Sequence, residues 1–217
     1  MNTDRIFSST TRHALLVGAL FTAACTTPTQ GPSEAPAEAT EGLSIASRVF
    51  AAADPSREIA ALSDADRAKF DGVTTPGELE VAETLLDEDG TALKVESVAK
   101  PDYSGCYGWH QKYGRKALLG NTLYTYWQST SVCVTSGKVT SVSVYDDGGE
   151  TSTPGWRITH APTTATKNVS WEGRGKAQYY FVFGAGGWDI QHPTDCIQQR
   201  LNGNGKDHAS SGSCDLG

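Results

Sequence analysis

The 217-residue chain lacks the segments that several classes of protein need. Its apolar run at residues 14–24 has 11 residues, too few for a helix that spans a bilayer, which needs about 20. It has no run of Lys and Arg, so we expect no nucleic-acid partner. It also has no close cysteine pair of the zinc-knuckle kind and no glycine-rich phosphate loop opening a helix, so we predict neither a metal site nor a cofactor.

The N-terminus instead has the features of an export signal. Arg5 and Arg12 precede the short apolar run, and small residues close it, which predicts a signal peptide over residues 1–24. The segment Thr22-Ala23-Ala24-Cys25 resembles the lipobox of bacterial lipoproteins, although that family usually has Leu where this chain has Thr22. The resemblance implies that Cys25 carries lipid and that the partner is a membrane, held through this anchor. Cleavage after Ala24 without lipidation is the alternative.

The cysteine count agrees with an anchor at Cys25. An exported chain with an odd number of cysteines has one left over, and this chain has five: Cys25, Cys106, Cys133, Cys196 and Cys214. Cys106 and Cys133 are symmetric about a turn at Leu119-Gly120, and the other two bracket the turn sequence LNGNGKD. We therefore predict disulfides Cys106–Cys133 and Cys196–Cys214, with the two crossed pairings as alternatives.

Composition divides the rest of the chain into three parts. Residues 25–42 form a Thr-, Pro- and Glu-rich tether that we expect to be disordered. Residues 43–100 predict an acidic segment of short helices, with caps at Asp54 and Ser63. Its best helix is expected over residues 75–90, where Thr75, Pro76 and Glu78 make a capping-box start. Charge follows the same division, since residues 26–103 carry 16 acids and 6 bases, and residues 104–217 carry 8 and 10.

Residues 103–217 predict a disulfide-bridged β domain. Aromatic and β-branched residues alternate with Ser, Thr and Gly, and Ser136-Gly137 marks a hairpin. Further strands are expected at 168–172 and 177–183. The fold class is therefore α+β, with short acidic helices followed by an antiparallel sandwich or partly closed barrel.

The signals for catalysis are thin. Asp189 and His192 lie close together in the sequence, and His110 is a third candidate. A base steered by an aspartate, or a metal held by both histidines, is conceivable chemistry. Neither arrangement is a known motif, and no G-x-S-x-G elbow is present. We therefore assign no catalytic residue.

Binding has more support in the sequence. All five tryptophans and all eight tyrosines fall in the β domain, and the strand LYTYWQ has aromatics on both faces. The residues expected to bind a ligand are Tyr124, Tyr126, Trp156 and Trp188, with core packing as their alternative role. The sequence favours a non-enzymatic envelope or extracellular protein that binds a polysaccharide or an envelope protein. The alternative is a secreted hydrolase or hydrolase inhibitor with the helical segment as a pro-region.

Overall fold

A computed structural model describes residues 36–87, 89–92, 100–185 and 188–217. The chain divides into two compact units, 1–33 and 34–217, and all the described residues belong to the second. The predicted signal peptide, Cys25 and most of the predicted tether lie outside the described residues.

Three short helices begin the described chain: α1 (Ala37–Ala51), α2 (Pro55–Ala60) and α3 (Asp64–Thr74). Both predicted caps are present, because Asp54 accepts from the Arg57 amide and Ser63 from the Asp66 amide, each at 3.1 Å. The predicted tether extends too far, since residues 37–42 belong to α1. Ala39, Ile45 and Val49 on that helix are buried in the core, which accounts for its order.

The predicted helix over residues 75–90 is wrong. Residues Pro76–Leu86 form strand β1, which pairs antiparallel with β2 from Leu79 opposite Arg115 to Leu86 opposite Gly108. Leu79 and Leu85 lie on one face of this strand and pack against the core. Pairing with β2 and partial burial of these two leucines therefore override the local helix signals.

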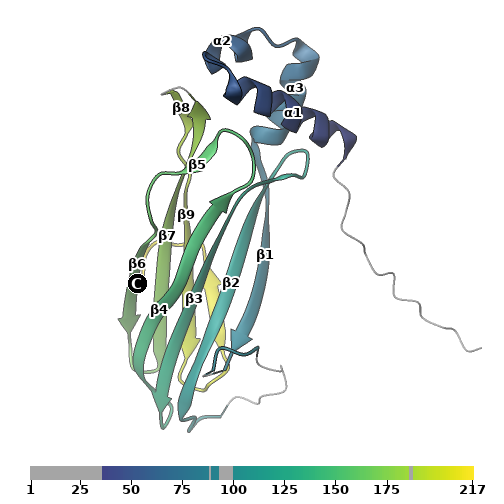
Figure 1. Ribbon diagram of the computed structural model, residues 1–217. Helices are drawn as coiled ribbons and strands as arrows, with labels where there is room; N and C mark the ends of the chain where they lie inside the picture. The colour runs from purple at the N-terminus through teal and green to yellow at the C-terminus, as the bar shows by residue number, and fades with distance from the viewer. Residues whose placement is uncertain (1–35, 88, 93–99, 186–187) are drawn as a thin grey trace, which may run out of the picture. The chain divides into compact units, whose positions relative to one another are not determined.

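The first sheet has four antiparallel strands in the order β1-β2-β3-β4 (Figure 1). Its other strands are β2 (Gly105–Ala117), β3 (Thr122–Thr135) and β4 (Lys138–Thr151). The predicted hairpin turn is confirmed: Ser136 and Gly137 have φ of 48° and 74°, as a two-residue primed turn requires.

The second sheet is built around β7, which pairs with four other strands. Its members are β5 (Trp156–Ile158), β6 (Thr163–Asn168), β7 (Glu172–Ala185), β8 (Trp188–Gln191), β9 (Thr194–Asn202) and β10 (His208–Ser211). The predicted strand 177–183 lies within β7. The predicted strand 168–172 is instead the turn between β6 and β7, where Ser170 has a φ of 71°.

The two sheets pack face to face as an open sandwich, with a core in two apolar clusters. One cluster joins the helices to both sheets, for example through Phe50 and Phe183, whose ring centroids are 5.5 Å apart. A Cβ on Gly173 would lie 2.4 Å from Val132, so glycine there lets the sheets approach. Helices and strands thus form one compact unit, with no boundary between units near residue 100.

Both predicted disulfides are present. Cys106 and Cys133 are directly opposite in β2 and β3, with Cα atoms 4.1 Å apart. Cys196 of β9 is bonded to Cys214 beyond β10, with Cα atoms 5.4 Å apart. Closing loops of 27 and 18 residues, each bond stabilises the fold by about 3 kcal/mol in the chain-entropy model.

Candidate binding face

The residues that the sequence favoured for ligand binding belong to the core. Tyr124, Tyr126 and Trp156 are 1%, 2% and 5% exposed. The Tyr124 ring stacks on Phe181 with centroids 3.9 Å apart, and Trp156 Nε1 donates to the Thr74 carbonyl at 3.2 Å. These three side chains are therefore core residues and not an exposed ligand surface, because the tyrosine face of β3 packs against the second sheet and Trp156 of β5 packs on Phe183. Trp188 is the first residue of β8, and the structure describes its backbone but not its side chain.

The buried tyrosines form a hydrogen-bonded layer inside the sandwich. Tyr124 Oη donates to Asp195 at 2.8 Å, and Asp195 also pairs with Arg115 at 3.4 Å. Burial, with the nearby Asp195 charge, raises the pKa of Tyr124 and Tyr126 well above their usual value. Both hydroxyls therefore stay protonated and uncharged at neutral pH, as a core position requires.

The opposite face of β3 carries a different tryptophan. Trp127 points outward from the first sheet and is half-buried. Its ring lies against the backbone of the neighbouring strand, since a Cβ on Gly148 would be 2.6 Å from Trp127 Cζ2. The Lys112 ammonium is 5.5 Å from the ring centroid, within the range of a cation–π contact. Trp127 thus lies flat on the outside of the sheet.

A β-bulge places two more residues on this face. The register between β3 and β4 shifts between Ser129 and Thr130, so that Tyr145 has no cross-strand partner. Tyr145 is 52% exposed, and its hydroxyl lies beside Gly108 on the outer side of β2. Asp146 follows it and accepts a 3.2 Å hydrogen bond from Trp127 Nε1. Bulges commonly direct side chains in this way next to functional sites.

His110, Ser129 and Asp146 lie in one row across the sheet but are not arranged as a catalytic triad. His110 Nδ1 is 2.8 Å from Ser129 Oγ and 3.9 Å from Asp146 Oδ2, so one ring nitrogen faces both partners. A triad needs the two partners on different nitrogens, and Ser129 is only 2% exposed. Ser129 Oγ also lies 3.4 Å from Asp146 Oδ2 as a donor. The row therefore holds Asp146, and through it Trp127, in position.

Two hollows lie on the outer face of the first sheet, each beside a glycine of β2. One, of about 440 Å³, is lined by Gly108, Ser131, Tyr145 and Asp87 among others. The other, of about 580 Å³, lies beside Gly114 and the outer side of β1. The second hollow is the nearer one to the aromatic ring, because it is lined by Lys112, whose ammonium contacts Trp127.

Carboxylates are in excess around the ring. Glu150 pairs with Lys112 at 3.4 Å and Glu80 with Lys116 at 3.2 Å, while Asp146 and Asp87 add negative charge. Hydrogen bonds from Thr125 and Lys112 lower the pKa of Glu150 below its usual value. The face therefore offers many hydrogen-bonding groups and a slightly negative field.

The other catalytic candidates lie elsewhere. Asp189 and His192 line a hollow of about 230 Å³ at the second sheet, with His160 and Tyr180. Asp189 forms an ion pair with Arg157. Its carboxylate therefore binds Arg157 and not His192, which it was expected to orient. Within residues 36–87, 89–92, 100–185 and 188–217, no three His, Cys, Asp or Glu side chains are grouped closely enough to hold a metal ion.

No family model matches the chain, and neither a curated protein nor a solved structure matches it. Among the described residues, none of the helices has the length and apolar character needed to cross a membrane. The sequence does contain a signal for this site: strand alternation groups Trp127 with Ser129, Ser131 and Cys133, a small polar set that suits an outer face.

Proposed function

We propose that this protein is an exported, lipid-anchored envelope protein whose β sandwich binds a neutral glycan on the outer face of the first sheet, without catalysis. The observation that carries the proposal is the fixed indole of Trp127, which lies against Gly148 and is hydrogen-bonded to Asp146. A rigid aromatic ring among hydroxyl, amide and carboxylate groups can stack on a sugar ring while its neighbours hydrogen-bond the hydroxyls.

The chemistry of the face favours a neutral sugar polymer over two other ligands. The excess of carboxylates disfavours a polyanionic chain. A protein partner is expected to use a larger apolar core than Trp127 and Tyr145 offer. The hollow lined by Lys112 and Gly114 gives space for a ligand near the ring.

The binding proposal is tested with alanine variants of two aromatic residues on the face and one aromatic residue away from it. Trp127→Ala and Tyr145→Ala are expected to reduce retention on isolated envelope polysaccharide by about tenfold or more, as loss of a central aromatic contact does. Trp171, at the turn between β6 and β7, is 56% exposed, and Trp171→Ala is the matched control with unchanged retention. Retention that is equal in all three variants, or absent in the unaltered protein, overturns the proposal.

Export and anchoring have a separate test. Two disulfides in the folded unit support an oxidising compartment. The intact mass of the native protein is expected to equal residues 25–217 plus lipid, with a gain of four hydrogens on reduction. Cys25→Ser is expected to remove the lipid mass and release the protein from membranes. A lipid-free native mass contradicts the anchor and leaves the glycan proposal standing.

A further inference from the structure

The outer face of the second sheet carries a strip of four cations. Lys167 of β6 is opposite Arg174 of β7, and Arg174 is opposite Arg200 of β9. Lys176 lies two residues along β7 from Arg174, on the same face. We call Lys167, Arg174, Lys176 and Arg200 the cationic strip.

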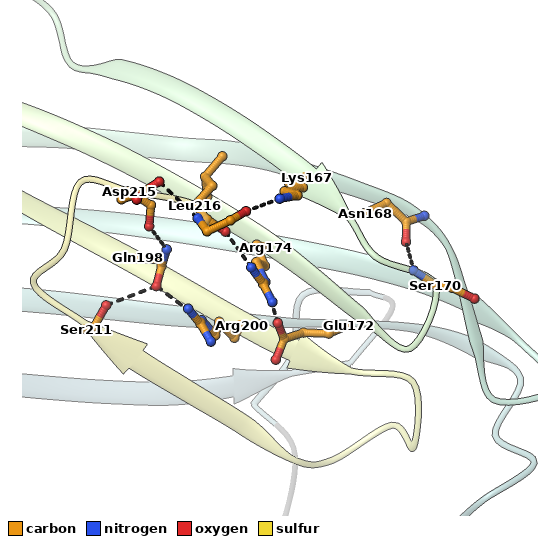
Figure 2. Close-up of polar contacts among 11 residues, drawn as sticks. Lys167, Asn168, Ser170, Glu172, Arg174, Gln198, Arg200, Ser211, Asp215 and Leu216 are labelled. Atoms are coloured by element: carbon orange, nitrogen blue, oxygen red, sulfur yellow. Dashed lines mark hydrogen bonds and ion pairs between the residues drawn. The ribbon is translucent and has the colours of Figure 1, made fainter.

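Residues 212–217 lie across this strip, and Figure 2 shows their contacts with Lys167, Arg174 and Gln198. Lys176 Nζ donates to the Cys214 carbonyl and Arg174 Nη1 to the Leu216 carbonyl, each at 2.6 Å. Gln198 Nε2 donates to the Asp215 carbonyl, and Lys167 Nζ to the Gly217 carbonyl. Four successive carbonyls are thus each held by a different side chain.

The covering segment is also tethered to the sheet. Cys214 is bonded to Cys196 of β9. Although they belong to the outer face, Cys196 and Gln198 are only 5% and 1% exposed. The tether places the segment at a high effective concentration over the strip.

The charge of the strip is poorly compensated. Arg174 is paired with Glu172 at 2.5 Å. In the part of the chain that the structure describes, no Asp or Glu side chain lies within ion-pair distance of Lys167, Lys176 or Arg200. Lys176 and Arg174 contact the neutral amide carbonyls of Cys214 and Leu216. Such oxygens are weaker partners for ammonium and guanidinium groups than oxyanions are, because hydrogen bonds between ionised groups are shorter and stronger.

We propose that the cationic strip is a second binding site, for a linear polymer with a phosphate or carboxylate on successive repeats, and that residues 212–217 cover it. Because the covering segment is tethered, a single anion competes poorly, whereas a polymer engages several cations at once. The strip itself contains no aromatic side chain on which nucleic-acid bases could stack. This site is on a different face from Trp127 and does not depend on the glycan proposal.

The test removes the cover. The variant that lacks residues 213–217 and carries Cys196→Ser is expected to bind inorganic polyphosphate with a Kd about tenfold or more below that of the full chain. Polyglutamate is the second probe: tighter binding to it than to polyphosphate assigns the ligand to carboxylate polymers. Orthophosphate is expected to bind neither form measurably. Adding Lys167→Gln and Lys176→Gln is expected to abolish the gain, whereas the matched change Lys138→Gln, on β4 of the first sheet, preserves it.

Two results overturn the proposal. One is an equal polymer affinity with and without the cover, and the other is a gain that survives Lys167→Gln and Lys176→Gln. If the truncated chain does not melt cooperatively, the full-length pair Cys196→Ser and Cys214→Ser decides instead, since it loosens the segment without removing it. A gain in binding to phosphatidylglycerol vesicles but to neither soluble polymer also counts against the proposal.

Discussion

Trp127 Nε1 donates a 3.2 Å hydrogen bond to Oδ1 of Asp146, which lies on the neighbouring strand directly after the bulge at Tyr145. The other carboxylate oxygen of Asp146 is 3.4 Å from the Ser129 hydroxyl. A bulge in one strand thus orients an aromatic ring on the next. Both residues lie outside the core, so their coupling is a property of the binding face and contributes little to folding.

Asp146→Ala is therefore expected to weaken glycan binding by about three- to tenfold, because the indole loses the bond that orients it. The melting temperature is expected to stay within a few degrees of the unaltered protein. Affinity electrophoresis in polysaccharide gels measures the first effect and calorimetry the second. Asp189→Ala, at the second sheet, serves as the control. Equal migration of both variants would show that Asp146 does not orient the ring.

Gly148→Val is expected to displace the Trp127 ring, since the added Cβ would lie 2.6 Å from Cζ2. The result should be weaker glycan binding and a red shift of the Trp127 contribution to fluorescence, obtained by subtracting the spectrum of Trp127→Ala. Gly212→Val is the matched control, because Gly212 follows β10, away from this face, and its Cβ would meet nothing closer than 4.0 Å. An unchanged spectrum for Gly148→Val would contradict the packing of the Trp127 ring against Gly148.

Tyr124→Phe distinguishes the core role of this residue from the ligand-binding role that its sequence indicated. The change removes the 2.8 Å hydrogen bond to Asp195 and is expected to lower the free energy of unfolding by about 1–2 kcal/mol. Urea denaturation measures this loss, and glycan affinity is expected to be unchanged. Lost affinity at unchanged stability would restore Tyr124 as a ligand contact.

Stability is expected to fall at alkaline pH. Burial raises the pKa of four tyrosines above the usual value of 10.0, namely Tyr107, Tyr124, Tyr126 and Tyr179. The tyrosines of the unfolded chain therefore lose their protons at a lower pH than those of the folded protein. The free energy of unfolding has its full value below pH about 10 and decreases as the pH rises further. Each fully shifted tyrosine contributes up to about 1.4 kcal/mol per pH unit. Urea midpoints at pH 8 and pH 11 measure the effect. Tyr124→Phe should reduce its slope, and an identical midpoint at both pH values would contradict it.

Some features of the fold were predictable because they depend on residues close in sequence. The helix caps at Asp54 and Ser63, the turn at Ser136-Gly137 and both disulfides follow from local spacing. The strand over 76–86 was not predictable in this way. Its sequence satisfies a helical capping box, and only pairing with β2 makes the extended form more stable.

The sequence by itself determined the antiparallel β character and the alternation that separates Tyr124 and Tyr126 from Trp127. It favoured the observed cysteine pairs but left the two crossed pairings open, and the structure decided between them. The sequence did not decide which face of β3 is buried, because alternation is the same whichever side meets the second sheet. That choice depends on glycines 173 and 175 of β7, whose backbones let the sheets close over the tyrosine side. Tertiary packing therefore made the tyrosines core residues and left Trp127 on the surface. It also brought residues 212–217 onto the cationic strip, a contact between segments up to 50 residues apart that no local pattern encodes.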